Sequence, residues 1–310
     1  MWRGSKHPTD SCKARSVDRS RTDSAWLHPP IDAVRDAVKQ ALAEDLTPLG
    51  DLTSSLVPPM LSEARIVPRR PGRLAGTLCV DETFAAVDAN VVVSWSVDEG
   101  AVVSAGEVAG IVRGPLASIL TAERTALNFL GHLSGIATLT AEYVEAAASA
   151  GGRAQVWDTR KTTPGLRSLE KAAVRSGGGR NHRGNLSDWI LVKDNHLVGI
   201  GIAQAVATAR DRWPGRPVQI ECDIFDQCVE ALEAGADAVL LDNMSPEEIA
   251  ACVAAAEVRQ GGQLRRTLIE ASGGIDLETI AACSAAGPDM ISVGGLTNSA
   301  PVLDIGFDLD

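Results

Sequence analysis

The C-terminal half of the chain alternates short apolar strands with helical segments. The strand candidates beyond Gly152 read RAQVWD, DWILVK, PVQIEC, DAVLLD, RTLIEA and DMISVG, and most are separated by a segment of helical pattern. Apolar strands that alternate with helices predict a parallel sheet, because each parallel connection has to cross over the sheet. This half of the chain is therefore predicted to be an α/β domain.

Each predicted strand ends in a polar or glycine-rich cluster. The clusters are Asp158-Thr159-Arg160-Lys161, Lys193-Asp194-Asn195-His196, Glu221, Asp242-Asn243, Ser272-Gly273-Gly274 and Gly294-Gly295. A (β/α) barrel builds its active site at the C-terminal ends of its strands, whereas an open doubly wound sheet uses that edge only around its switch point. Contributions from every strand favour a closed or nearly closed barrel. Because six or seven strands fall short of the usual eight, we predict an incomplete barrel.

The N-terminal half has a different pattern. An amphipathic helix is predicted after Pro29-Pro30, and from Glu63 to Gly114 the sequence reads as short β-segments, EARIVPRR, RLAGTLCV, VVVSWSV and EVAGIVRG. These predict a small antiparallel sheet or sandwich with a helix packed against it. Helical periodicity then runs from Leu116 to Leu133, is expected to break at Ser134-Gly135, and resumes to Ala148.

The predicted division is an extension (residues 1–25), an N-terminal sandwich-like α+β domain (26–125), the barrel (126–295) and a C-terminal segment (296–310) that returns to the N-terminal domain. The first 25 residues are polar, carry charges of both signs and lack the apolar core of a secretion signal, so we expect disorder there. No apolar run approaches the roughly 18 to 20 residues of a membrane span, and no membrane partner is expected.

Positive charge gathers in one part of an acidic protein. The stretch from Trp157 to His196 carries eight Lys or Arg against four Asp or Glu, while the whole chain has a formal net charge of −11. This contrast predicts a pocket for a small, multiply charged anion, and a sequence pI near 5.0 argues against a nucleic-acid partner. The six cysteines form no CxxC pair, which is typical of reduced thiols in a cytoplasmic protein.

The candidate anion-binding residues are Arg160, Lys161, His182, Arg183 and Lys193. Arginine binds carboxylates and phosphates with a planar fork, and lysine acts as a point charge. The alternative is a set of solvated loop cations paired with Asp158 and Asp194, but convergence on one barrel face favours the anion site. The nearby Gly177-Gly178-Gly179 is either a phosphate loop or a hinge that presents His182 and Arg183.

The sequence allows two roles each for the acidic pair Glu221 and Asp242 and for Arg124. Glu221 and Asp242, at successive strand ends, would either share Mg²⁺ or serve as salt-bridge partners for the cations. Arg124 and Glu123 are the only charges between Leu116 and Leu139, so Arg124 either forms a buried ion pair with Glu123 or is delivered to an active site in another subunit. The glycines after the last two strands lie where barrels commonly bind phosphate.

Taken together, these motifs resemble the quinolinate phosphoribosyltransferase family. The resemblance runs in order from about Ala43 to the C-terminus, through AEDLTPLGDLTS, ILTAERTALNFLGHLSGIAT, WDTRKTTPGLRSLEKAAVRSGGGRNHR, ILVKDNH, GADAVLLDN, EASGGI and VGGLTNS. It implies transfer of the 5-phosphoribosyl group from phosphoribosyl pyrophosphate to quinolinate with loss of CO₂, which gives nicotinate mononucleotide and pyrophosphate. It also implies a homodimer in which the N-terminal region of one subunit completes the site of its partner.

The resemblance also implies residue roles. Arg160, Arg183 and Lys193 would grip the two quinolinate carboxylates, with Thr159 and His182 nearby and Arg124 arriving from the partner. The implied catalytic set is Lys161, on the phosphoribosyl donor, with Glu221 and Asp242 on the ribose hydroxyls and Mg²⁺. The implied 5′-phosphate site consists of Ser272, Gly273, Gly274, Gly294, Gly295 and Asn298.

One position departs from the family pattern. The final loop usually carries histidine in a GALTHS-like run, but this chain has Asn298, which donates a hydrogen bond without carrying charge. Weaker binding of the donor or a flatter pH dependence is expected. The competing hypotheses are a related enzyme that acts on another acid and a non-catalytic anion-binding protein. Retention of the Arg/Lys cluster favours a dicarboxylate, and Lys161, Glu221 and Asp242 favour an enzyme.

Overall fold

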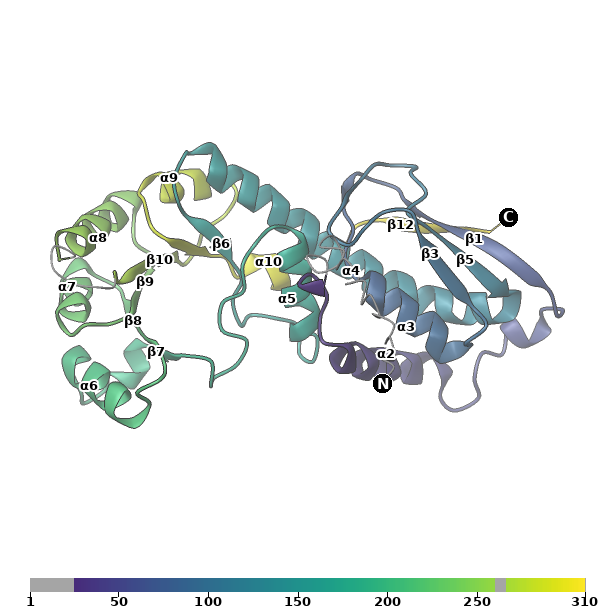
Figure 1. Cartoon of the computed structure of the whole chain (residues 1–310), viewed down its shortest axis with the longest axis horizontal. Helices are drawn as coiled ribbons and strands as arrows, with labels where there is room; N and C mark the ends of the chain where they lie inside the picture. The colour runs from purple at the N-terminus through teal and green to yellow at the C-terminus, as the bar shows by residue number, and fades with distance from the viewer. Residues whose placement is uncertain (1–24, 260–265, 310) are drawn as a thin grey trace, which may run out of the picture.

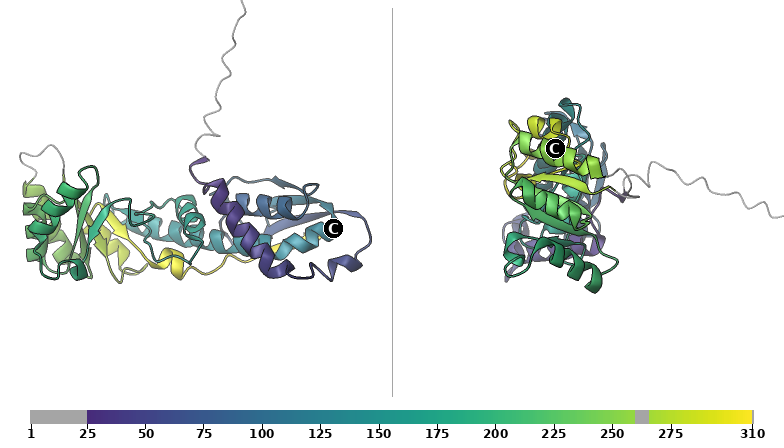
Figure 2. Two further views of the ribbon diagram at one scale, coloured as in Figure 1. Left: turned by 90° about the horizontal axis from the view of Figure 1, so that it is seen from below. Right: turned by 90° about the vertical axis from the view of Figure 1, so that its left-hand side faces the viewer.

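The computed structural model describes residues 25–259 and 266–309, so nearly all of the predicted N-terminal extension, and Cys12, lie outside the described residues. Two lobes lie side by side along the long axis of the molecule (Figure 1), joined by the 34-residue helix α4, Leu116–Ser149. Figure 2 shows the same elongated outline from below, with the N-terminal lobe at one end and the parallel sheet at the other.

The N-terminal lobe is one antiparallel sheet covered by helices. Its strands β1 (Leu61–Pro68), β3 (Val92–Trp95), β5 (Gly110–Pro115) and β12 (Ile305–Leu309) lie in the order β12-β1-β5-β3. Helices α2 (Ile31–Leu46), α3 (Thr77–Val87) and α4 pack in sequence, α2 on α3 and α3 on α4. The lobe also contains the 3₁₀ turn η1 (Ser54–Leu56) and the two-stranded ribbon of β2 (Gly72–Arg73) and β4 (Val102–Val103).

The segment RLAGTLCV is a correction to the sequence analysis. It was predicted as a strand, but only Gly72–Arg73 is extended, and α3 begins at Thr77. The carboxylate of Glu99 accepts hydrogen bonds from the backbone nitrogens of Gly76 and Thr77 at 2.8 and 3.0 Å. These bonds satisfy two amides that every helix N-terminus leaves free. The helix therefore starts on a cap supplied from more than twenty residues away.

The C-terminal lobe is a parallel sheet of six strands in the order β6-β11-β10-β9-β8-β7. The strands are β6 (Gln155–Trp157), β7 (Ile190–Val192), β8 (Val218–Cys222), β9 (Ala238–Asp242), β10 (Leu268–Ser272) and β11 (Met290–Ser292). All six were predicted from the sequence. Strands β6 and β7 are the two edges and do not pair with each other, so the barrel is incomplete, as predicted.

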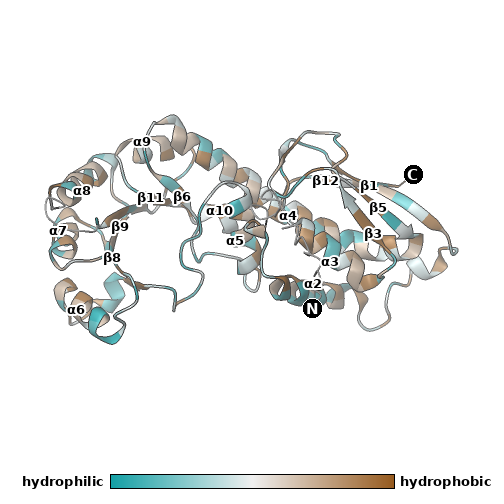
Figure 3. Cartoon of the chain, viewed as in Figure 1, coloured by the Kyte–Doolittle hydropathy of each residue, from teal (hydrophilic) through white to brown (hydrophobic). Residues whose placement is uncertain are grey.

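Helices cover this sheet on its outer side (Figure 1). They are α6 (Ile202–Arg212), α7 (Phe225–Glu233), α8 (Pro246–Arg259) and α9 (Ile280–Ala285). Helix α5 (Arg167–Ser176) and the short α10 (Gly295–Asn298) pack instead against α4 and against each other, and the 3₁₀ turn η2 (Asp194–His196) follows β7. Figure 3 shows hydrophobic residues along the strands and hydrophilic residues on outer turns of α6. Ile220, Leu241 and Ile269 of the central strands are almost fully buried, which is expected of a sheet that contributes its apolar runs to the core.

Helix α4 does not break at Ser134-Gly135, so that prediction is wrong. Gly135 lies where residues 301–302 cross α4 on the way from the C-terminal lobe back to β12. A Cβ at this position would lie 2.0 Å from the carbonyl oxygen of Pro301. The glycine is needed for this close approach and not for a turn. Among the described residues, no helix is both long enough and apolar enough to cross a bilayer.

Candidate active site

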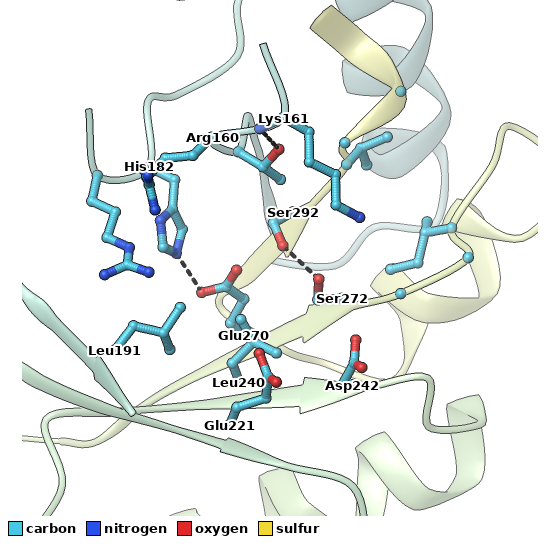
Figure 4. A pocket seen from close by; sticks show the side chains of 18 of the residues that line it. Arg160, Lys161, His182, Leu191, Glu221, Leu240, Asp242, Glu270, Ser272 and Ser292 are labelled. Atoms are coloured by element: carbon cyan, nitrogen blue, oxygen red, sulfur yellow. Dashed lines mark hydrogen bonds and ion pairs between the residues drawn. The ribbon is translucent and has the colours of Figure 1, made fainter. Parts of the chain in front are cut away.

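A cavity of about 590 Å³ lies at the C-terminal ends of the parallel strands (Figure 4). It brings together all the barrel residues predicted from the sequence: Thr159, Arg160, Lys161, His182, Arg183, Lys193, Glu221, Asp242, Ser272, Gly273, Gly274, Gly294, Gly295 and Asn298. They come together because parallel strands place their carboxyl ends on the same edge of the sheet. Leu191, Leu240, Ile275 and Val293 give the cavity apolar walls.

Asp158 anchors the two loops that carry the predicted anion-binding residues. Its fully buried carboxylate accepts hydrogen bonds from Lys171 Nζ, from Asn181 Nδ2 at 2.6 Å and from the backbone nitrogen of His182 at 2.8 Å. Lys171 Nζ also donates to the His182 carbonyl at 3.0 Å. Burial raises the pKa of Asp158, and Lys171 opposes that shift. Asp158 therefore neutralises Lys171 and not the cations of the cavity, so the alternative of a solvated loop cation paired with Asp158 is wrong.

Two of the cavity cations, Arg160 and Arg183, form no ion pair with another of the described residues. Arg160 Nε is buried and has no hydrogen-bond partner in the described part of the chain. Burial lowers the pKa of Arg183, and the neighbouring Arg160 lowers it further. A buried cation without a partner is costly, and an anionic ligand between the two guanidinium groups would remove that cost. The arrangement is typical of a carboxylate or phosphate site.

The two carboxylates at the ends of β8 and β9 have different partners. Glu221 Oε2 forms an ion pair with Lys193 Nζ, whereas Asp242 Oδ2 accepts a hydrogen bond from its neighbour Asn243 at 3.0 Å. Glu221 thus takes the salt-bridge role that the sequence left open, and Asp242 does not. Within residues 25–259 and 266–309 no group of three or more His, Cys, Asp or Glu side chains could hold a metal ion by itself.

Glycine is required where the loops after β10 and β11 line the cavity. Gly273 has a φ of 92°, and a Cβ there would lie 2.3 Å from Asn243 Oδ1. At Gly294 a Cβ would lie 2.9 Å from Lys161 Cδ, so the glycine lets the lysine side chain lie against the backbone. Thr297 Oγ1 also donates to the Lys161 carbonyl at 2.8 Å. The loops after β6 and β11 therefore form one surface.

Two alternatives from the sequence analysis are wrong. Gly177 and Gly179 do not line the cavity; a Cβ at Gly177 would lie 2.4 Å from the carbonyl oxygen of Ala137 in α4. The triple glycine therefore serves close packing against α4 and not phosphate binding. Arg124 is not part of a buried ion pair, because its side chain is 69% exposed and its Nη2 lies 3.9 Å from Glu123 Oε1. It does not line the cavity of its own chain.

Sequence analysis missed Glu270 and Ser292, which also line the cavity. Glu270 lies in the middle of β10, where a pattern at strand ends does not reveal it, whereas Ser292 is the last residue of β11, two residues before Gly294. Glu270 had a detectable signal, since it is the one charged residue in the apolar run LIEAS of β10. Its side chain is fully buried.

Both lobes of the chain match the two domains of one protein family. Residues 51–134 and 136–308 match the N-terminal and C-terminal domains of the family described as quinolinate phosphoribosyl transferase. A Mycobacterium leprae relative named nicotinate-nucleotide pyrophosphorylase [carboxylating] is 40% identical over 286 residues, which cover 90% of this chain and 98% of the relative. A human relative of the same name is 40% identical over 290 residues, 92% of this chain and 94% of the relative.

The fold agrees with the sequence match. The solved structure of the nicotinate-nucleotide pyrophosphorylase from Francisella tularensis superposes with a TM-score of 0.85 at 36% identity, covering 92% of this chain and 99% of that one. The family predicted from the sequence motifs is confirmed. The chain therefore belongs to the quinolinate phosphoribosyl transferase family, the decarboxylating pentosyltransferases of NAD biosynthesis.

Proposed function

We propose that this chain transfers the 5-phosphoribosyl group from phosphoribosyl pyrophosphate to quinolinate, with the cavity residues in the roles that follow. The single observation that carries the assignment of the acid is the pair of half-buried arginines, Arg160 and Arg183, with the buried Arg160 Nε unpartnered in the described structure. Quinolinate has two adjacent carboxylates. Arg160 and Arg183 supply one cation for each carboxylate, and Lys193, the ion-pair partner of Glu221, is a third cation beside them. Thr159 and His182 lie on the same cavity wall.

The donor occupies the other side of the cavity. Lys161 contacts the phosphoribosyl donor, and Glu221 and Asp242 hold the ribose hydroxyls. The 5′-phosphate lies on the backbone amides and side chains of Ser272, Gly273, Gly274, Gly294, Gly295 and Asn298. Support for this assignment comes from the glycine positions that let the backbone approach closely, and from Lys161 lying against Gly294.

Charge and positioning account for the chemistry. Departure of pyrophosphate breaks the bond from C1′ to oxygen and leaves positive charge on the ribose, which Glu221 and Asp242 stabilise electrostatically. The ring nitrogen of quinolinate donates its electron pair to C1′ and becomes a pyridinium. The pyridinium then stabilises the electron pair that CO₂ leaves on C2, and a proton adds at C2. No covalent nucleophile is needed when the reactants are held in line.

Mg²⁺ fits this site as a shared ligand of protein and substrate. Glu221 and Asp242 present hard oxygen atoms at neighbouring strand ends, and Mg²⁺ typically binds one or two carboxylates together with substrate phosphates and waters. When bound, the ion would neutralise charge that develops on the departing pyrophosphate. These two carboxylates are the residues that would hold it.

A homodimer would complete the site. Arg124 is exposed and does not line the cavity of its own chain, so it is available to enter the cavity of a partner as a further cation for the acid. We also infer a cytoplasmic location without nucleic-acid or membrane partners. The five described cysteines are buried and form no disulfide with one another, as in a reducing compartment, and burial raises the pKa of Cys79 and Cys222 to about 12.

The test supplies purified protein with phosphoribosyl pyrophosphate, Mg²⁺ and either quinolinate or nicotinate, and measures pyrophosphate and nicotinate mononucleotide. Product from quinolinate alone, lost on chelation of the metal, is the expected result. Product from nicotinate would mean that the cation cluster does not select a dicarboxylate. Binding of quinolinate without release of pyrophosphate would identify an anion-binding protein and refute the proposed reaction.

A further inference from the structure

Helix α5 presents three cations at four-residue spacing, Arg167, Lys171 and Arg175, and this spacing places them on one face of the helix. None of the three is among the residues that line the active-site cavity. Lys171 binds Asp158 and the carbonyl of His182, as described above. The roles implied by the family resemblance include none for Arg167, the first residue of the helix.

Arg167 joins the two loops that carry the cavity arginines. Its Nη1 donates to the Gly184 carbonyl at 3.2 Å, and its Nε donates to Thr162 Oγ1 at 3.0 Å. Its Nη2 lies 3.5 Å from the carbonyl oxygen of Arg160, at the outer limit of a hydrogen bond. One planar guanidinium group therefore connects the backbone of Arg160 with the residue that follows Arg183.

The two loops need such a connection because their arginines repel each other. Arg160 and Arg183 line the same cavity, and neither forms an ion pair with another of the described residues. Burial lowers the pKa of Arg183, and the positive charge of Arg160 lowers it further. Like charges that are partly shielded from water favour separation of the loops that carry them. Without an anionic ligand, the two guanidinium groups stay close only if other bonds hold their loops together.

Arg167 supplies the hydrogen bonds that link these loop segments. In the described chain, no hydrogen bond runs directly from residues 159–163 to residues 183–188. Each segment is instead attached separately: the backbone nitrogen of Thr163 donates to Glu170 Oε2 at 3.0 Å, and that of Gly184 donates to Asp188 Oδ2 at 2.6 Å. Arg167 therefore connects two segments that are otherwise held by different partners.

The acceptors around Arg167 suit a guanidinium group and not an ammonium group. Each of its three nitrogen atoms lies near a different oxygen atom. A guanidinium group offers donors in a fixed plane that can meet three acceptors at once, whereas lysine is a compact point charge on a flexible stem. Arginine is also charged at every physiological pH. The connection therefore does not depend on the titration of any group.

We propose that Arg167 is a positioning residue that holds the Arg160 and Arg183 loops at the separation that two adjacent carboxylates require, and that it thereby determines selectivity for a dicarboxylate over a monocarboxylate. This inference rests on the proposed function. A dicarboxylate contacts both arginines at once, so it binds more tightly when their spacing is fixed before binding. A monocarboxylate needs only one of them and gains little from that spacing.

The test is Arg167→Lys, which keeps the positive charge but loses the planar fork. Dissociation constants are measured by titration calorimetry for quinolinate and for phthalate, which has the same two adjacent carboxylates on benzene. The dissociation constant of nicotinate, with one carboxylate, is measured by competition with phthalate. We expect the constants for both dicarboxylates to rise about tenfold, the size of one lost charged hydrogen bond, and that for nicotinate by less than about twofold. The KM for the ribosyl donor should change little.

Arg210 provides a matched control on α6. Its guanidinium group also donates to a loop carbonyl, that of Gly235, and lies 3.3 Å from Asp237 Oδ2. These acceptors directly precede β9, at the end of the sheet opposite the cavity. Arg210→Lys should leave all three dissociation constants unchanged. Equal losses for quinolinate and nicotinate in Arg167→Lys would mean a general disturbance of the site and would overturn the proposal.

Thr162→Val tests the same connection from its other end. It keeps the shape of the side chain but removes the acceptor of Arg167 Nε, so selectivity for quinolinate over nicotinate should fall by a smaller factor, about threefold. Unchanged selectivity in Thr162→Val would overturn the proposal even if Arg167→Lys does not fold. A wild type that binds quinolinate selectively but releases no pyrophosphate would refute the proposed function, while loss of that selectivity in Arg167→Lys would still support the role of Arg167.

Discussion

Asn298 ends α10 on the rim of the cavity, where the family pattern usually has histidine. Its Oδ1 already accepts a hydrogen bond from Ser299 Oγ at 2.6 Å, so its amide nitrogen is the group left for a phosphate oxygen. A neutral hydrogen-bond donor binds a phosphate less tightly than a cationic one does. Any contact between Asn298 and the phosphoribosyl donor would therefore add a binding energy that does not vary with pH.

Asn298→His is expected to lower the KM for the ribosyl donor about fivefold below pH 6, since a charged hydrogen bond is stronger by roughly 1 kcal/mol. The effect should fade as pH rises and the ring loses its proton. Initial rates at varied donor concentration from pH 5.5 to 8.5 would measure it, with Asn298→Gln as the neutral control. Unchanged donor KM and pH profile in Asn298→His would show that this side chain does not contact the phosphate.

At the scale of elements, the six barrel strands could be predicted because each is an apolar run that ends in polar residues. Helix α3 could not, because its cap comes from Glu99, which is distant in sequence. Glu270 could not be predicted as a cavity residue for a related reason, since only the folded sheet places it opposite His182. Local patterns identify elements and strand ends, whereas caps and buried pairs between elements depend on tertiary contacts.

Gly135→Ala in α4 tests the close approach of Pro301 to this helix. Alanine normally favours a helix over glycine by up to about 1 kcal/mol, but here its Cβ would lie 2.0 Å from the Pro301 carbonyl oxygen. A net loss of about 2 kcal/mol in the free energy of unfolding is expected from this overpacking. Gly131→Ala is the control, because its Cβ would lie 3.0 Å from the Leu303 carbonyl oxygen and needs a smaller shift. Denaturant unfolding that ranks the two variants in the opposite order would contradict the explanation.

At the scale of the whole molecule, Arg175 fastens the N-terminal segment to the active-site loop. Its guanidinium donates to the carbonyls of Trp26 and His28 at 2.6 and 3.0 Å and to Asn181 Oδ1 at 2.6 Å. It also lies 4.9 Å from the centre of the Trp26 ring. Asn181 directly precedes His182, so the segment that starts at Trp26 supports a wall of the cavity.

Deletion of residues 1–24 is expected to leave unfolding free energy and kinetics unchanged, whereas deletion of residues 1–28 should cost roughly 2 kcal/mol through the lost charged hydrogen bonds and cation–π contact. The longer deletion should also raise the KM for quinolinate. Thermal unfolding and steady-state rates of the two truncated proteins provide the comparison. Loss of activity in the shorter deletion would show that the extension itself has a role.

The proposed donation of Arg124 between subunits predicts that two inactive variants complement each other. Arg124→Ala and Asp242→Ala should each be nearly inactive alone, and refolding them together should recover about a quarter of the wild-type rate. Random pairing makes half of the dimers mixed, and each mixed dimer has one intact site of two. No recovery, with mixed dimers verified by mass, would mean that Arg124 acts in its own chain or not at all.

The pairing of β12 with β1, in which Phe307 faces Ile66 in register, has a consequence for how the protein is made. On the ribosome, the N-terminal sheet emerges early, but one edge of β1 finds its neighbour only after residues 305–309 have been synthesised. Throughout translation of the barrel, that edge offers unpaired backbone groups to any other extended chain. The helices that cover the sheet can form without delay. Completion of the first lobe therefore waits on synthesis of the second, and the nascent chain is most vulnerable to aggregation during that interval.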